Sequence, residues 1–164
     1  MRHLIAFILL AGLALAVAGL DTRKELQVDY TDDNLAARHI AGVWGPDADL
    51  NIRLGMTNTA WKRVEFERND RIVILIPDKF SIPLQRFRIF LAGWMRFEDR
   101  SCPFVLISYQ GNPTIMYFLE EQKGVFNDAR SINVFLAPAA DRKQDVLYLA
   151  FGKDNDKLNA FKRQ

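Results

Sequence analysis

Residues 31–45 read TDDNLAARHIAGVWG, a short helical pattern that leads without a spacer into an apolar strand. Thr31 is a typical N-cap residue, and the two aspartates after it favour the first turn of a helix. The apolar positions that follow form a narrow stripe, at Leu35, Ala36 and Ile40. We therefore expect a helix of about two turns that ends near His39, followed by a first β-strand that carries Trp44.

The remainder of the chain alternates between short apolar runs and turn residues. Apolar and polar positions that alternate with a period of two predict half-buried strands, most clearly at residues 61–68 and 86–98. The full set of strands predicted after the opening stretch is residues 50–54, 61–68, 72–76, 86–98, 104–109, 115–119, 132–137 and 146–151. Residues 110–113 predict a hairpin turn, residues 124–130 a loop, and Gly93 a bend or bulge in its strand.

Regularly spaced strands with no helix between them predict an all-β fold. We expect a small antiparallel up-and-down barrel of about eight strands with a short N-terminal helix. A closed barrel is favoured over an open sheet because closure removes the exposed edges of strongly apolar strands. The chain has 164 residues, of which 49% are hydrophobic and 26% charged, a composition typical of a globular domain. We assign a single domain to residues 31–164.

The first residues have the pattern of an export signal. A short basic start at Arg2 precedes an apolar run, and Ala16-Val17-Ala18 is a small-x-small cleavage site. Residues 1–18 therefore predict a signal peptide and a secreted or periplasmic protein. The alternative is a retained N-terminal anchor, which would place the protein at a membrane. Residues 19–30 are polar and irregular, and we interpret them as a flexible tether.

The net charge of the chain indicates which partners it can bind, and its single cysteine limits the disulfides that it can form. Removal of residues 1–18 takes away one of the 22 basic residues, against 20 acidic ones, so the remaining chain is nearly neutral. A nearly neutral chain is not typical of nucleic-acid binding, and we expect no nucleic-acid partner. Cys102 is the single cysteine, so it is either a buried thiol or one half of an intermolecular disulfide.

The sequence carries no recognisable catalytic or metal-binding motif. His39 is the one histidine after residue 18, which leaves no histidine pair for a metal site and little basis for a Ser-His-Asp triad. Residues 47–51 alternate oxygen-bearing side chains as a calcium loop does, but Ile52 stands at the glycine position and Asn58 at the closing glutamate position. We therefore expect no enzyme activity, no catalytic residue, no metal and no cofactor.

Basic and aromatic residues gather in the segment 86–98. Alternate positions of a strand share one face, and this face would carry Arg86, Arg88, Phe90, Trp94 and Arg96. If the face points outward, its arginines pair with Glu65 and Glu67 on a neighbouring strand, or the face binds an acidic protein or glycan. If it points into the barrel, unpaired arginines imply an anionic ligand, such as a carboxylate with an apolar tail.

The opening stretch and the end of the chain carry a family resemblance. Gly42 and Trp44 form a Gly-x-Trp motif between a short helix and the strand pattern, and Arg163 lies beyond the last predicted strand. In these features the chain resembles the lipocalins and the wider calycin-like families. The resemblance implies that Trp44 closes one end of the barrel beneath the Arg163 side chain, in a cation–π contact. The alternative is that Trp44 is a core aromatic of another β fold.

These observations leave two functional hypotheses. The first, implied by the resemblance, is an exported, non-enzymatic, lipocalin-like protein that binds a small apolar or amphipathic ligand, which can include an anionic group. The second is a secreted or envelope interaction protein with a filled barrel, which docks an acidic partner through the arginine and aromatic face. A hollow interior would favour the first hypothesis, and a packed interior the second.

Overall fold

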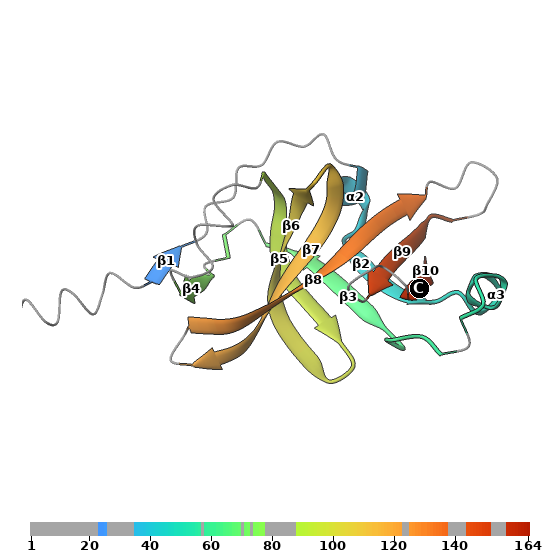
Figure 1. Ribbon diagram of the computed structural model, residues 1–164, viewed down its shortest axis with the longest axis horizontal. Helices are drawn as coiled ribbons and strands as arrows, with labels where there is room; N and C mark the ends of the chain where they lie inside the picture. Colours follow the sequence, from blue (N-terminus) through green and yellow to red (C-terminus); the bar gives the residue numbers. More distant parts are fainter. Residues whose placement is uncertain are drawn as a thin grey trace, which may run out of the picture.

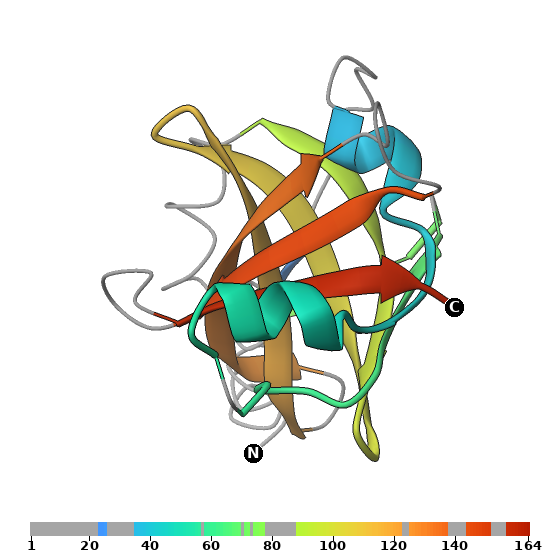
Figure 2. The same ribbon diagram turned by 90° about the vertical axis from the view of Figure 1, so that its right-hand side faces the viewer.

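Strand pairing closes the chain into a β-barrel, which the computed structural model shows in two views (Figures 1 and 2). The structure describes residues 23–25, 35–56, 58–69, 71–72, 74–77, 88–122, 125–137, 144–151 and 157–164. The helices in these ranges are α2 (Leu35–His39) and α3 (Ala48–Arg53). The strands are β1 (Arg23–Glu25), β2 (Gly42–Pro46), β3 (Val64–Arg68), β4 (Leu75–Pro77), β5 (Ile89–Phe97), β6 (Arg100–Tyr109), β7 (Asn112–Gln122), β8 (Val125–Ala137), β9 (Val146–Phe151) and β10 (Lys157–Arg163).

Eight of these strands form the barrel wall. β2, β3 and β5 to β10 pair antiparallel in chain order, and β10 pairs with β2 to close the ring. This is the small up-and-down barrel expected from the sequence, so the fold class is confirmed, and it is consistent with a calycin-like fold. β4 lies outside the ring, where it pairs in parallel with β8 through Leu75 and Val125 and antiparallel with β1.

Two local features agree with the sequence-based expectations. α2 ends at His39, and a tight turn at Gln110 and Gly111 joins β6 to β7 as a hairpin. The φ angles of these two residues are 51° and 81°, and a positive φ at both central positions is what a type I′ hairpin turn requires. The predicted cap Thr31 and the predicted signal peptide lie outside the described residues.

A helix replaces the strand predicted at residues 50–54. The Asp47 side chain caps α3 by accepting a hydrogen bond from the backbone N–H of Leu50, at 3.1 Å. A carboxylate at this position satisfies a free N–H group of the first turn and so favours a helical start. Ile52 is 71% exposed. The apolar residues at alternate positions therefore do not form the buried face of a strand, and the strand predicted at residues 50–54 is wrong.

One buried side chain attaches α3 to the barrel. Asn51 is 2% exposed, and its amide forms two hydrogen bonds with the backbone of Ala160 in β10. Asn51 Nδ2 donates to the carbonyl oxygen and Asn51 Oδ1 accepts from the N–H, both at 2.8 Å. These reciprocal bonds hold the helix against one wall of the barrel, as Figure 2 shows from the α3 side.

Three other segments differ from the expectations. β8 begins at Val125, inside the predicted loop, because its first residues pair with the end of β7 rather than turning away. β10 forms where no strand is predicted. Its central residues Asn159, Ala160 and Phe161 are buried, and its charged residues lie at its two ends. Of residues 72–76, only the last two belong to a strand, β4. Its partner β1 lies within the segment interpreted as a tether.

A β-bulge interrupts β5 near its start. The pairing between β5 and β6 shifts between Ile89 and Leu91, so Phe90 and Leu91 both contribute to the barrel core. An extra residue in one strand breaks the alternation of faces at that point. The sequence places this irregularity at Gly93, but Gly93 keeps a regular pairing with Phe104.

Gly93 allows the backbones of β5 and β3 to approach closely, so its substitution should strongly reduce stability. A Cβ atom at this position would overlap the backbone carbonyl group of Glu67 in β3, because the two strand backbones approach closely there. Gly93→Ala should therefore lower the free energy of unfolding by about 3 kcal/mol, since backbone atoms cannot move aside as a flexible side chain does. Urea unfolding monitored by circular dichroism measures this, with Ser101→Ala on β6 as the control, and equal stability of the two variants would refute it.

Candidate functional site

One end of the barrel is closed by Trp44 and Arg163. Trp44 is fully buried, and its indole Nε1 donates a hydrogen bond of 2.7 Å to the carbonyl oxygen of Ile40. The Arg163 guanidinium lies over the indole, 4.4 Å from the ring centroid. It also donates to the carbonyl oxygens of His39, at 2.6 Å, and Ala41, at 2.7 Å. This is the contact that the resemblance to lipocalins implies.

Gly42 completes this closure. Its φ angle is 126°, a conformation that only glycine adopts without strain. A Cβ atom on Gly42 would also overlap Nη1 of Arg163. The three residues that carry the family resemblance therefore form one structural unit with α2, in which glycine leaves the space that the arginine occupies.

Aromatic side chains fill the described interior near the opposite end. Trp61, from the segment that precedes β3, stacks on Phe97 with 4.5 Å between the ring centroids. Its ring also makes edge contacts with Tyr117, at 6.3 Å, and with Phe151, at 4.9 Å. Most of these rings belong to the buried cluster that includes Trp44, and Phe151 packs against it. The described interior side chains therefore pack against one another along the barrel.

The structure divides the five residues expected on one strand face. Arg86 lies outside the described residues. Arg88 is exposed just before β5, with its guanidinium carbon 5.4 Å from the centroid of the Phe90 ring. The bulge turns Phe90 into the barrel core, whereas Trp94 is half-buried and Arg96 exposed. A single face with all five residues is therefore wrong, because the alternation breaks at Phe90.

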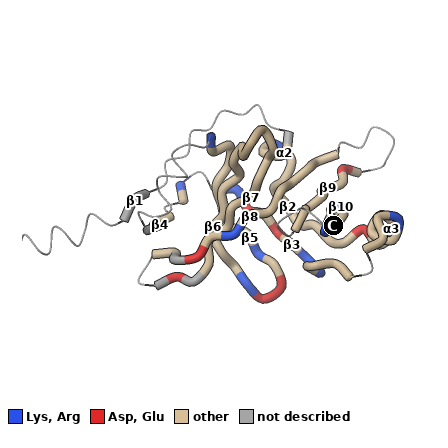
Figure 3. The backbone as a smooth tube through the Cα atoms, viewed as in Figure 1, with Lys and Arg blue, Asp and Glu red and all other residues tan. Residues whose placement is uncertain are grey.

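Arg96 points outward and is paired. Its guanidinium lies 3.6 Å from a carboxylate oxygen of Glu65 and 3.2 Å from one of Glu67, both on β3. For this arginine the outward alternative, with pairing to the neighbouring strand, is confirmed. Exposed pairs of this kind contribute at most about 1 kcal/mol to stability. Figure 3 shows acidic and basic segments side by side along the β5–β6 hairpin.

The barrel wall opens between β6 and β7. Their pairing stops at Phe104 and Tyr117, although β6 begins at Arg100 and β7 continues to Gln122. Beyond this point β6 pairs with β5, and β7 pairs with β8. Figure 1 shows the two hairpins diverging. A pocket of about 420 Å³ lies in this opening.

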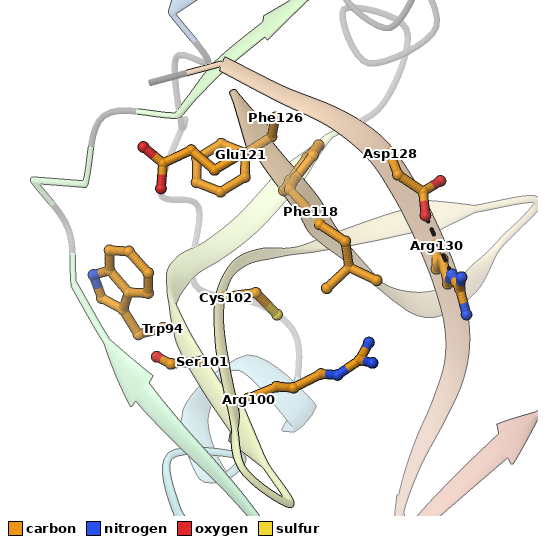
Figure 4. Close-up of a pocket in the computed structure, with 10 residues that line it drawn as sticks. Trp94, Arg100, Ser101, Cys102, Phe118, Glu121, Phe126, Asp128 and Arg130 are labelled. Atoms are coloured by element: carbon orange, nitrogen blue, oxygen red, sulfur yellow. Dashed lines mark hydrogen bonds and ion pairs between the residues drawn. The ribbon is translucent and has the colours of Figure 1, made fainter. Parts of the chain in front are cut away.

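Apolar and charged side chains line this pocket together (Figure 4). The apolar group is Trp94, Phe118, Leu119 and Phe126. The polar group is Arg100, Ser101, Cys102, Glu121, Asp128 and Arg130. Arg130 Nε donates to a carboxylate oxygen of Asp128 at 3.3 Å, whereas Arg100 forms no ion pair with any described side chain. In Figure 4 the Arg100 side chain extends past Cys102 toward the Asp128–Arg130 pair.

Cys102 lines the pocket as a protonated thiol. Burial raises its pKa to about 12, and the positive charge of Arg100 opposes this shift without cancelling it. Burial also raises the pKa of the Tyr117 phenol. Because the thiolate is the reactive form of cysteine, Cys102 is not prepared as a nucleophile near neutral pH. Of the two alternatives for this cysteine, the structure shows the buried, free thiol.

The described residues hold no group of three or more histidine, cysteine, aspartate or glutamate side chains that could bind a metal. In the calcium-like segment, Asp47 caps α3 and Asn51 bonds to Ala160, so both side chains are engaged in the fold. None of the described helices has the length and hydrophobicity needed to cross a membrane.

Comparisons with protein-family models, with curated proteins and with solved structures found no match for this chain. The fold assignment therefore depends on the strand pairing itself. The closure at Trp44 and Arg163 adds a geometric likeness to calycin-like barrels, and the site assignment depends on the pocket between β6 and β7.

Several residues of this pocket were not candidates in the sequence. Asp128 and Arg130 fall in the segment predicted as a loop, and Arg100 follows a turn. The signal that could have found them is the alternation that links positions 126, 128 and 130 to the buried Ile132. In the structure Asp128 pairs with Leu119 and Arg130 with Tyr117, so both charged residues continue a strand.

Proposed function

We propose that this protein is a non-enzymatic, lipocalin-like binding protein. Its ligand is small and amphipathic, with an apolar body and an anionic head. The observation that carries the proposal is the pocket between β6 and β7, which joins aromatic and aliphatic side chains to the Arg100 guanidinium. Export through the signal-like residues 1–18 is part of the same proposal, and N-terminal sequencing of the exported protein tests it.

The size and position of the pocket suit such a ligand. Sites for small molecules usually measure about 300–1,000 Å³ and are mostly apolar with a few polar groups, and this pocket of about 420 Å³ lies in that range. It opens through the side of the barrel, whereas Trp44 and Trp61 occupy the interior toward the two ends. The ligand therefore enters between the strands, with its apolar body against Phe118 and Leu119.

The charges favour a head with a single negative charge. A guanidinium can bind a carboxylate through two parallel hydrogen bonds, and Arg100 has no described carboxylate partner. Arg130 is different, because Asp128 already pairs with it. Glu121 also lines the pocket, and its charge together with that of Asp128 would repel a second negative charge on the ligand. A monocarboxylate with an apolar chain meets these conditions.

A fluorescent fatty acid should bind the protein and quench tryptophan emission, because Trp94 lines the pocket. Arg100→Gln should weaken binding about tenfold, which corresponds to the loss of a charge-assisted hydrogen bond. Ser101→Trp should abolish binding by filling the pocket from an exposed position. Trp94→Phe should preserve the affinity and remove most of the quenching. Fluorescence titration measures all four effects.

Arg63→Gln serves as the control, because Arg63 is an exposed arginine paired with Glu65 away from this pocket. Its affinity for the probe should equal that of the unchanged protein. If Arg100→Gln and Ser101→Trp also bound the probe as tightly as the unchanged protein does, the pocket between β6 and β7 would not be the binding site. If the protein bound no fatty acid of any chain length, the proposed function would be wrong. The second hypothesis, docking of an acidic partner, stays a prediction. The packed interior of the described barrel favours it, but the arginine and aromatic face that it requires is not formed, since Arg96 is paired and Phe90 is buried.

A further inference from the structure

A proline marks the point where β6 and β7 cease to pair. Phe104 is the first residue of β6 that pairs with β7, and Pro103 lies immediately before it. Proline has no backbone N–H group and cannot donate a hydrogen bond to a neighbouring strand. Among the described strands, the residues of β6 before Pro103 pair with β5 alone. One edge of β6 is therefore open beside the pocket, which Ser101 and Cys102 line.

The open edge presents the backbone groups of Ser101. In an antiparallel pair, successive residues of a strand direct their N–H and C=O groups to opposite sides. The N–H of Ser108 donates to the carbonyl oxygen of Arg88, on the β5 side of β6, at 3.2 Å. The odd-numbered residues of β6 therefore face β7, as the two-residue turn between Tyr109 and Asn112 also requires. Because Ser101 is exposed and lines the pocket, its N–H and C=O groups face the opening.

The molecule shows elsewhere how an amide satisfies a strand edge. At Ala160 in β10, the Asn51 side chain accepts from the backbone N–H and donates to the carbonyl oxygen, both at 2.8 Å. Pairing of β10 with β2 starts at the next residue, Phe161, so the amide takes the place of a neighbouring strand. Backbone groups that are covered need such partners. A ligand that covers Ser101 must therefore offer one hydrogen-bond donor and one acceptor.

A fatty acid meets only half of this requirement. Its carboxylate accepts hydrogen bonds, but no donor lies next to it. An amino acid with an acylated nitrogen has both groups, since its amide N–H donates and its carboxylate accepts. Two residues that face each other in an antiparallel pair exchange these same two bonds. An N-acyl amino acid therefore matches the edge at Ser101, and it retains the apolar chain and the single negative charge.

We propose that the ligand of the pocket between β6 and β7 is an N-acyl amino acid. This inference rests on the proposed function, which assigns the pocket, the apolar chain and the carboxylate. The amide N–H of the ligand donates to the Ser101 carbonyl oxygen. The carboxylate accepts from the Ser101 N–H and from the Arg100 guanidinium, and the acyl chain lies against Phe118 and Leu119, which line the same pocket.

Calorimetric titration of the full chain with three ligands of similar length tests the inference. N-dodecanoylglycine should bind about tenfold more tightly than pentadecanoate, which has a chain of equal length without the amide. N-dodecanoylsarcosine, in which a methyl group replaces the amide hydrogen, should lose this advantage. Equal affinity for N-dodecanoylglycine and pentadecanoate would overturn the inference and leave the proposed function intact. Failure of all three ligands to bind would overturn both.

Two substitutions at one position test the strand edge itself. Ser101→Pro removes the backbone N–H that faces the opening, at an open edge where proline is tolerated, and should weaken the binding of N-dodecanoylglycine about tenfold. Ser101→Ala is the matched control, because it removes the hydroxyl group and retains both backbone groups, and its affinity should be unchanged. Unchanged affinity for Ser101→Pro would contradict the inference. If Ser101→Pro does not fold, the comparison of ligands on the unchanged protein still decides.

Discussion

Trp44→Ala should lower the free energy of unfolding by about 3–5 kcal/mol, the cost of removing a large aromatic side chain from a packed core. The indole is fully buried, donates to the Ile40 carbonyl oxygen and lies under the Arg163 guanidinium. Truncation to alanine removes all three interactions and leaves a cavity beneath α2. Urea unfolding at neutral pH, followed by circular dichroism, measures the change.

Two variants separate the parts of this effect. Trp44→Phe keeps an aromatic ring but loses the Nε1 hydrogen bond and part of the volume, so it should cost less than alanine. Arg163→Lys keeps the charge but cannot bond to the His39 and Ala41 carbonyl oxygens in the fixed geometry of a guanidinium. Trp94→Phe, at a half-buried position in the wall, serves as the control. A cost below about 1 kcal/mol for Trp44→Ala would show that Trp44 does not hold this end of the barrel.

Asn51→Ala should have the second large effect, a loss of about 2–4 kcal/mol in the free energy of unfolding. The substitution leaves the Ala160 N–H without its partner, at a cost of about 1–3 kcal/mol for a buried group left unpaired. The Ala160 carbonyl oxygen also loses the bond from Asn51 and keeps the one that the Asp47 N–H donates at 2.9 Å. Both hydrogen bonds of the Asn51 amide measure 2.8 Å, and Asn51 is 2% exposed, so water cannot replace the amide without opening the contact between α3 and β10.

Asn58→Ala provides the comparison for this measurement. Asn58 is an exposed asparagine of the segment after α3, and its removal should change the stability by less than about 0.5 kcal/mol. Asn51→Asp should be destabilising as well, because a carboxylate accepts from the Ala160 N–H but cannot donate to its carbonyl oxygen. Equal midpoints for Asn51→Ala and Asn58→Ala in thermal unfolding would contradict the role assigned to Asn51.

Strand alternation predicted the barrel because most wall strands have one face in the core and one in solvent. β3 is the clearest case, with Val64 and Phe66 buried and Glu67 exposed. The hairpin turn at Gly111 was also predictable, since local backbone conformation decides it. These features depend on residues close in the chain, and local patterns are sufficient to find them.

The errors lie where distant contacts decide the structure. Residues 50–54 alternate like a strand, yet the Asp47 cap and the Asn51 contact with Ala160 select a helix. The start of β8 is polar because it pairs with the end of β7 beside an opening in the wall, not because the chain turns there. Neither partner can be identified from the neighbouring sequence.

The same distinction applies to the functional residues. Gly42, Trp44 and Arg163 were found together because they match a family pattern, and the structure brings them into contact. The predicted strand face that joins arginines to aromatic residues is not formed. One extra residue at Phe90 shifts the alternation of the strand, so Phe90 points into the core. The wall opening depends on where β6 and β7 cease to pair, a feature that has no signature within either strand.

The closure of the barrel also determines how the chain folds. The bonds that close it join residues far apart, 109 positions between Asn51 and Ala160 and 122 between Ala41 and Arg163. β5 to β8, by contrast, pair with their neighbours through short connections. Because long loops lose more entropy when their ends meet, we expect the central meander and the sequence-adjacent pair β9 and β10 to form first, and the pairing of β10 with β2 to limit the rate. Until that pairing forms, β2 and β10 expose unpaired edges to other chains, so we expect the greatest risk of aggregation just before the ring closes.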